Sequence, residues 1–428
     1  MRARGKLDPL RERVADVIER DRQDLVDLAL YLGGIASPAG HERHIAEAAV
    51  EWMKSNGIDA YVQPITETSA NAIGVVRGVA DGKSLAVDAH LDTGAPGPVG
   101  PGEMGKRMET GWVEGDMIYG HGIINCKAQV AAFMMAARTL KKAGIQLKGD
   151  LTVCAVAFET GGPSVDEHQG IQYPGEGMGT RWLIDRGIVP DYALVGETSE
   201  FTIVAAECGA AELKVTVPGR VVNTARLERG KAWHENPNSF ERAGHVLLAL
   251  EEWAKQYQER EKVRFYGGTI VPKAQVRSVR GGGRVGGGGN QCSIHLDVRI
   301  APGKDPRLIQ REIRDLTRSL GLECEVSLYQ WNRGYIAQNA EPLIQAVTEA
   351  HRYVLGSEPA EPPPHTLSMW RDHNAFNEVG IPSICYGPPR LKEPYTDAQD
   401  RAMKIADLVA VSKVYALTAM AVCGVAGR

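Results

Sequence analysis

Short apolar runs alternate with longer segments of helical periodicity over the first half of the chain, and this alternation limits the possible folds. Apolar residues recur at helical spacing in residues 24–35, 44–56 and 127–143, and a shorter helix is predicted at 181–186. Strand-type runs lie at residues 71–76, 84–89, 151–157 and 192–195. Because parallel strands need a crossover that is usually a helix, we expect an α/β fold with a mostly parallel sheet flanked by helices.

The pattern changes near Cys208 and changes back after about 120 residues. Residues 212–217 and 292–300 alternate like half-exposed strands, and residues 239–256 and 306–320 have helical periodicity. This block predicts a small α+β domain, with two strands and a helix followed by two strands and a helix. We therefore place an inserted domain at 209–327 and a larger catalytic domain at 1–208 and 328–428, where the first pattern resumes at 344–354, 381–386 and from 398 onward.

Composition excludes several classes of protein. A chain of 428 residues is too long for one ordinary core, which agrees with two domains. The net charge of -4, without a basic stripe, gives no support for a nucleic-acid partner. The N-terminal segment is charged throughout, and the apolar stretches are too short or interrupted to span a bilayer, so no membrane partner is expected. The seven cysteines form no CxxC pair, so reduced thiols and a cytoplasmic location are expected.

Two potential metal ligands end the strand predicted at 84–89. His90 and Asp92 stand two positions apart, so in an extended chain they face the same side. At the carboxyl end of a parallel strand, that side opens into the crevice where α/β proteins bind ligands. A carboxylate beside an imidazole also holds it in the form that ligates a metal. Taken alone, the HxD pattern is equally typical of an ordinary loop.

Three further polar residues follow predicted elements in the same way. Asn125 stands at the start of the long helix, where it is either a ligand or the helix N-cap. Glu159 and Glu197 each end an apolar strand, and a partly desolvated carboxyl group has the raised pKa of a general base. Each is also compatible with a plain strand end. Their convergence with His90 at one sheet edge is more informative than any of them alone.

The segments SLAVDAHLDT, YGHGIINCKAQ, AVAFETGG, DYALVGE and GIPSICYGPP, in this order, resemble a known zinc-dependent family. That family contains aminoacylases, acetylornithine deacetylases, succinyl-diaminopimelate desuccinylases and related carboxypeptidases. The resemblance covers nearly the whole chain. It implies a zinc-peptidase-like sheet with an inserted ferredoxin-like domain. It also implies two metal ions that share a bridging aspartate, with a glutamate as the general base.

The first metal site of that family is retained. His90, Asp92 and Glu197 match the family pattern, and Glu159 falls on the general-base position when residues are counted without gaps. The bridging aspartate is replaced by Asn125, whose neutral oxygen is a poor bridge between two cations. The resemblance thus implies Glu159 and Asp92 as catalytic residues, and His90, Asn125 and Glu197 as metal ligands.

Both private ligands of the second metal are replaced. Thr160 stands where the family has a glutamate, and Tyr395 is the nearest counterpart of the C-terminal histidine. We therefore expect one divalent transition metal ion, manganese, zinc or cobalt, in each subunit. A rival alignment places Glu159 on the second-site ligand and leaves Phe158 at the base position, which would describe a damaged site.

The resemblance also marks residues that contact substrate. A histidine from the inserted domain corresponds either to Asn223 or to His234, and both alternatives stay open. Arg371 is expected to bind a substrate carboxylate through its planar fork, beside Asp372, although a capping aspartate and a surface arginine would look the same. Arg299 either faces the substrate or braces its strand. Tyr395 completes the expected set.

One metal ion stabilises less negative charge than two, so the substrate is expected to hold part of that charge itself. The expected function is hydrolysis of a C–N bond in a small carboxylate-bearing molecule. The specific expectation is deamination of an electron-poor aromatic amine, 5-nitroanthranilate to 5-nitrosalicylate plus ammonia, an activity that the family includes. The alternatives are an N-acyl amino acid deacylase or dipeptidase, and a non-catalytic binding protein with a degenerate metal site. The inserted domain usually carries family dimerisation, so a homo-oligomer is expected.

Overall fold

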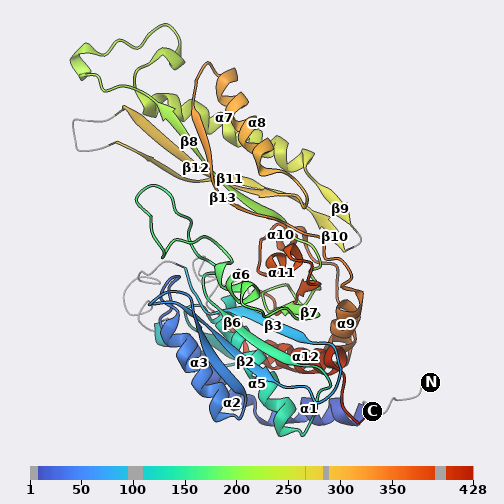
Figure 1. Cartoon of the computed structure of the whole chain (residues 1–428). Coiled ribbons are helices and arrows are strands. Elements are labelled where there is room, and N and C mark those ends of the chain that lie inside the picture. The colour runs from blue at the N-terminus through green and yellow to red at the C-terminus, as the bar shows by residue number, and fades with distance from the viewer. Residues whose placement is uncertain (1–7, 95–108, 266, 283–288, 391–401, 428) are drawn as a thin grey trace.

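The computed structural model describes residues 8–94, 109–265, 267–282, 289–390 and 402–427, and it has two bodies. Figure 1 shows the larger body below, built around a six-stranded sheet, and the smaller body above it, built around a four-stranded sheet. The chain passes between them twice, before β8 (Gly209–Pro218) and after β13 (Glu325–Asn332). The α/β class and the inserted α+β domain that the sequence predicts are both present.

The main sheet is parallel where the candidate residues lie. Its strand order is β1-β2-β6-β3-β7-β14. The pairings β6–β3, β3–β7 and β7–β14 are parallel, whereas β1–β2 and β2–β6 are antiparallel. All residues of β2 and β3 are buried, as expected for strands covered on both faces. The bounds are β1 (Asp59–Pro64), β2 (Ala70–Val76), β3 (Leu85–His90), β6 (Leu151–Val156), β7 (Tyr192–Val195) and β14 (Ser383–Cys385).

Helices cover both faces of this sheet. One face shares a single hydrophobic core with six helices, and the other packs against two short helices. The six are α1 (Asp8–Arg20), α2 (Arg22–Gly33), α3 (Arg43–Ser55), α5 (Ala128–Lys142), α9 (Glu341–Leu355) and α12 (Ile405–Cys423), and the two are α6 (Met178–Asp185) and α11 (His373–Glu378).

Helix α12 is long and apolar enough to cross a membrane, but it occupies the position of a core helix. Two thirds of its most apolar window (67%) is buried, and it packs against α5 and α9. Its apolar residues point in all directions because neighbouring helices and the sheet surround it.

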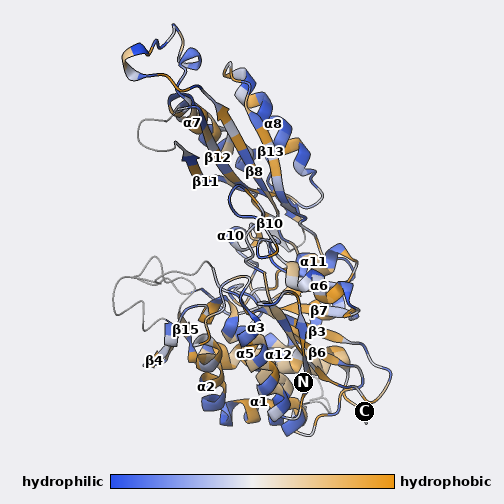
Figure 2. Cartoon of the chain, turned by 60° about the vertical axis from the view of Figure 1, so that its left-hand side comes forward, coloured by the Kyte–Doolittle hydropathy of each residue, from blue (hydrophilic) through white to orange (hydrophobic). Residues whose placement is uncertain are grey.

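The smaller body follows the order strand, helix, two strands, helix, strand. Its sheet order is β11-β12-β8-β13, and all pairings are antiparallel. One face packs against α7 and α8, which both carry hydrophobic and hydrophilic residues in Figure 2. The expected boundary at residue 327 falls inside β13. The bounds are α7 (Ser239–Arg260), β11 (Ala274–Gly281), β12 (Gln291–Ile300) and α8 (Pro306–Ser319).

Small elements complete the described chain. They are the sheet β4 (Trp112–Glu114), β5 (Met117–Tyr119) and β15 (Ala402–Lys404), the hairpin β9 (Val263–Phe265) and β10 (Gly268–Ile270), the short helix α10 (Pro364–Leu367), and the turns η1 (Ile123–Lys127), η2 (Thr224–Arg226) and η3 (Trp233–Glu235).

Three sequence-based expectations differ from the structure. The inserted domain does not begin with two strands, because only the short turns η2 and η3 lie between β8 and α7. The helix predicted from residue 398 begins at Ile405, and residues 398–401 lie outside the described ranges. The strand predicted at 381–386 is limited to Ser383–Cys385, because only these residues pair with β7.

The core beneath the sheet edge depends on an aromatic pair. The rings of Phe133 in α5 and Tyr415 in α12 stack 4.1 Å apart, and the ring of Phe133 lies against Gly196, next to Glu197. We expect Phe133→Ala to lower the free energy of unfolding by about 3–5 kcal/mol, because it leaves a cavity that the surrounding helices cannot fill. Denaturant titration measures this. Leu248→Ala, at a side chain that is 73% exposed, is the control and should change stability by less than about 0.5 kcal/mol.

Candidate metal centre

His90 is the last residue of β3, and its ring is buried at the carboxyl edge of the sheet. The Nδ1 atom lies 2.8 Å from the backbone carbonyl oxygen of Asp92. Because a carbonyl only accepts, Nδ1 donates to it, and in the neutral imidazole this leaves Nε2 with a lone pair. The side chain is therefore oriented as a metal ligand usually is, with one nitrogen held by the protein.

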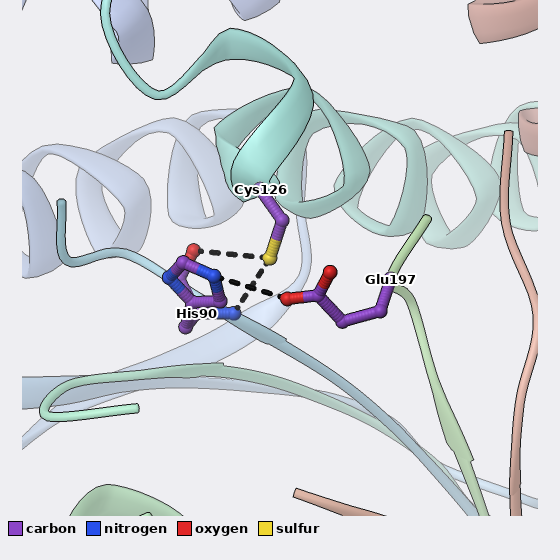
Figure 3. Close-up of side chains that lie close together, drawn as sticks. All are labelled: His90, Cys126 and Glu197. Carbon is purple, nitrogen blue, oxygen red and sulfur yellow. Dashed lines mark hydrogen bonds and ion pairs between the residues drawn. The ribbon is translucent and has the colours of Figure 1, made fainter. Parts of the chain in front are cut away.

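Oxygen atoms from three other segments surround Nε2 of His90. Oε1 of Glu197 lies 3.0 Å away, Oδ1 of Asn125 lies 3.3 Å away, and Oε2 of Glu159 lies 3.7 Å away. Figure 3 shows the Glu197 carboxylate pointing at the imidazole from the end of the neighbouring strand. Electron-rich atoms that face one another in a buried space repel unless a cation lies among them. The donor set of one imidazole and several oxygens therefore fits a divalent metal ion.

Asn125 does not cap the long helix. It lies in η1 with φ -129° and ψ 86°, and Lys127 is the N-cap of α5. The peptide bond after Asn125 is cis. If the amide is rotated, its nitrogen donates to both carboxylate oxygens of Glu197, at 3.2 and 3.1 Å. The side chain can thus present oxygen to a cation or hold Glu197 in place through its NH₂ group.

Cys126 is a residue of this site that the sequence interpretation missed. Its thiol is fully buried and accepts a hydrogen bond from the backbone N–H of His90 at 3.1 Å. The Sγ atom and the ligand atoms of His90 and Glu197 all lie within 4.8 Å of one another (Figure 3). Burial raises the pKa of this thiol well above its usual value. The available signal was its position directly after Asn125, rather than any spacing among the cysteines.

The Asp92 carboxylate accepts three hydrogen bonds from the turn that carries Glu159. Its carboxylate accepts from the backbone N–H of Glu159 at 3.0 Å, and from the N–H and the hydroxyl of Thr160 at 2.8 and 2.5 Å. Burial acts to raise the pKa of this carboxyl group, but hydrogen bonds from His90 and Thr160 outweigh it and lower the pKa. Asp92 therefore stays ionised, and Thr160 occupies its oxygens as a donor.

Glu159 presents its carboxylate to the site from the end of β6. Burial raises the pKa of this group well above its usual value, and the nearby Glu197 adds to the shift. Phe158, the base position of the rival alignment, has a fully buried phenyl ring that offers no proton acceptor. The ungapped count, in which Glu159 takes the base position, stays a prediction.

Arg371 has a different set of partners from the one we expected. Its terminal nitrogens donate to the Glu207 carboxylate and to the carbonyl oxygen of Thr198 at 2.8 Å, and its Nε lies 3.9 Å from Glu197. The planar fork is therefore engaged within the protein and is not presented to a substrate carboxylate. Burial opposes ionisation of Glu197, but His90 and then Arg371 lower its pKa to about 2. Glu207 is a further residue that sequence reasoning missed.

Asp372 lies beneath the site, without the capping role considered for it. It precedes α11, but its side chain makes no cap hydrogen bond. Burial raises its pKa to about 7, and its charge adds to burial in raising the pKa of Asp88, a fully buried residue two positions before His90. Both carboxyl groups are buried.

The other expected substrate residues are not brought to this site within one chain. Asn223 is exposed, and its side chain caps η2. His234 packs against Trp233 and lies next to Gly321. Both belong to the segment after β8, which lies at the far end of the smaller body in Figure 1. Arg299 braces its strand through two 3.0 Å contacts with Asp297. Tyr395 lies outside the described residues.

Comparison with known proteins identifies the family. The sequence pattern of peptidase family M20/M25/M40 matches residues 86–421 of this chain. The chain belongs to this family. Over 372 residues it is 25% identical to a LysW-lysine hydrolase of Deinococcus radiodurans, covering 86% of this chain and 89% of that protein. It is 22% identical to an N-formyl-4-amino-5-aminomethyl-2-methylpyrimidine deformylase of Halalkalibacterium halodurans, covering 95% and 96%.

A solved M20 structure has the same fold. The YXEP protein of Bacillus subtilis, described as a dinuclear metal-binding peptidase, aligns with a TM-score of 0.60 at 14% identity, covering 94% of this chain and 99% of that one. This chain is accordingly an M20-family, metal-dependent hydrolase that acts on amide or peptide C–N bonds. The expectation of a metallohydrolase of the aminoacylase and dipeptidase type is confirmed at this level.

Variants at the convergent side chains test which of them hold the ion. We expect His90→Ala and Glu197→Ala to weaken metal binding by more than about 100-fold, because each removes a donor atom. Cys126→Ser should weaken it by less than about tenfold, since serine can keep the hydrogen bond from the His90 N–H. Titration calorimetry with Mn²⁺ or Zn²⁺ measures the affinities. A loss in Cys126→Ser equal to that in His90→Ala would make the thiol a ligand.

Proposed function

We propose that this M20 protein hydrolyses a C–N bond of a small carboxylate-bearing substrate with a single divalent cation, and with Glu159 as general base. One observation carries the proposal. The Asp92 carboxylate is occupied by three hydrogen bonds from Glu159 and Thr160. A second cation would need an acidic bridge at position 125, where this chain has Asn125, and an acidic side chain at position 160, where Thr160 instead donates to Asp92. Support for the base comes from the 3.7 Å approach of Glu159 to His90.

Each residue of the site has a separate role in the proposed reaction. His90, Glu197 and the oxygen of Asn125 would hold the cation, which when bound lowers the pKa of a water molecule toward about 7. Glu159 takes a proton from the attacking water, and its raised pKa favours this transfer near neutral pH. It then passes the proton to the departing nitrogen. Arg371 stays behind Glu197 and keeps it ionised.

The sequence also led us to expect a reaction outside amide hydrolysis, the deamination of an electron-poor aromatic amine, and we keep it as a proposal with 5-nitroanthranilate as the example. Water adds to the ring carbon that bears the amine, the ring takes the negative charge, and ammonia leaves after it receives the proton. The products are 5-nitrosalicylate and ammonia. A site with one cation stabilises less charge than one with two, so a substrate that delocalises charge in its own ring suits it.

A second candidate is hydrolysis of an N-acyl amino acid or a dipeptide. It is favoured by the activities in the names of the relatives, which include a lysine hydrolase and a deformylase, and by the peptidase family itself. The same base and cation would serve, with an amide carbonyl carbon attacked in place of the ring carbon. A non-catalytic role is the third alternative, and it predicts no turnover of either class.

A different arginine takes the place of Arg371 as the proposed partner of the substrate carboxylate. Arg390 donates from Nε to the hydroxyl of Thr198 at 3.0 Å, and its positive charge contributes to the low pKa of Glu197. This places a half-buried guanidinium next to the proposed cation site. Homo-oligomerisation, a cytoplasmic location and the identity of the metal stay predictions.

Replacing the base separates turnover from metal binding. We expect Glu159→Gln to reduce kcat by about 10²–10⁴-fold, because an amide cannot accept the proton, while metal content is unchanged. Ammonia release from 5-nitroanthranilate and amino acid release from N-acyl amino acids and dipeptides are measured in parallel. Ammonia from the aromatic amine alone supports the deamination, and amino acid release alone supports the second candidate. Full activity of Glu159→Gln would contradict both.

The number of cations can be changed by design. The double variant Asn125→Asp, Thr160→Glu restores two acidic positions and removes a hydrogen-bond donor to Asp92. We expect the bound metal to rise from one to two equivalents, with weaker binding of the second. Elemental analysis after equilibrium dialysis measures the ratio. Asn125→Asp, Thr160→Gln is the matched control and should stay at one equivalent. Two equivalents in the unaltered protein would overturn the single-cation proposal.

A further inference from the structure

Glu159 stands at the start of a long irregular loop. We call residues 160–177 the Glu159 loop, because it begins directly after that residue, three residues beyond the end of β6, and ends at the start of α6. Its two ends are tied together: the N–H of Gly177 donates to the carbonyl oxygen of Phe158 at 2.9 Å, and the N–H of Gly175 donates to that of Gly162 at 3.1 Å. These hydrogen bonds bring the two ends of the loop together at a neck beside Glu159, as in a compact Ω-type loop.

The tip of the Glu159 loop contacts the smaller body. The carboxylate of Asp166 lies 2.5 Å from Nζ of Lys214 in β8, and 3.1 Å from Nε2 of His295 in β12. The neighbouring Glu167 pairs with Arg280 in β11. Figure 1 shows the green segment between β6 and α6 extending from the larger body toward the sheet of the smaller one. Three strands of that sheet therefore hold the tip.

A fourth contact lies nearer the neck. Oε2 of Glu176 accepts a hydrogen bond from the amide of Asn332, at the end of β13, at 3.4 Å. Between the loop and β13 is a cavity of about 540 Å³, lined in part by Tyr173 and Gln330. The two bodies are joined covalently by the segments before β8 and after β13, and β10 contacts α10, so the loop adds a further connection between them.

We propose that Asp166 is a positioning residue, which couples the placement of the inserted domain to the placement of Glu159. The neck is also where the coupling reaches the site, because the N–H groups of Glu159 and Thr160 both donate to Asp92. When the tip is held by Lys214 and His295, the neck keeps the base beside His90. The role in turnover rests on the proposed function, whereas the coupling itself does not.

The expected loss of kcat depends on how far the Asp166–Lys214 ion pair is exposed to water. Asp166 and Lys214 are each 20% exposed, so their ion pair is partly shielded from water, and it belongs to a network and is not isolated. A displacement of about 1 Å in a catalytic group lowers rates by up to about 100-fold. We expect Asp166→Asn and Lys214→Met each to lower kcat by about 5- to 20-fold, with KM changed by less than about twofold.

The matched control is another lysine–aspartate pair. Lys83 and Asp191 pair at 2.7 Å in the larger body, away from the Glu159 loop, and Lys83→Met should leave kcat unchanged. The exchanged pair Asp166→Lys, Lys214→Asp restores the attraction and should recover at least half of the lost kcat. A defect caused only by a misfolded loop would not be rescued in this way.

Hydrogen exchange tests the coupling without any substrate. In Asp166→Asn and Lys214→Met we expect the amides of Glu159 and Thr160 to exchange at least about fivefold faster than in the unaltered protein or in Lys83→Met. Unchanged exchange at these two amides overturns the coupling, whatever the activity. Faster exchange in a protein that hydrolyses neither substrate class supports the coupling and removes the proposed function. Faster exchange with unchanged kcat overturns Asp166 as a positioning residue.

Discussion

The structure depends on one electrostatic constraint: several electron-rich atoms converge on the buried imidazole of His90. The nearest, on Glu197 and Asn125, lie 3.0 and 3.3 Å from Nε2. Such an arrangement is costly in a buried space unless a cation or a set of donors compensates it. The ends of parallel strands bring these atoms together, and helices on both faces exclude water.

Buried charges around the site are arranged in pairs that keep its ligands ionised. Arg371 lies between Glu197 and Glu207, so its positive charge is shared by two carboxylates in a region that water does not reach. Asp92 is kept ionised by donors from His90 and Thr160. Asn125 and Thr160 stand where the family resemblance implies acidic ligands, and Thr160 serves as a hydrogen-bond donor to Asp92.

Much of the site could be predicted because it follows from strand direction. His90, Glu159 and Glu197 each follow an apolar run, and parallel strands place their carboxyl ends at one edge. Cys126 and Glu207 were missed because burial and close contacts with residues distant in sequence give them their importance. Arg371 was assigned to the substrate for a similar reason: its planar fork suits any carboxylate, and the fold supplied Glu207 as the partner.

The sequence by itself determined the class of fold, the domain insertion and the order of the site residues, because hydrophobic periodicity and strand-end polarity are local properties of the chain. The tertiary structure decided which polar groups meet. Asp166 and Lys214 are 48 residues apart, and Arg371 and Glu207 are 164 residues apart, so no local pattern reveals either pair. Long-range contacts of this kind depend on how two sheets and their loops pack, and that packing assigns each charge its partner.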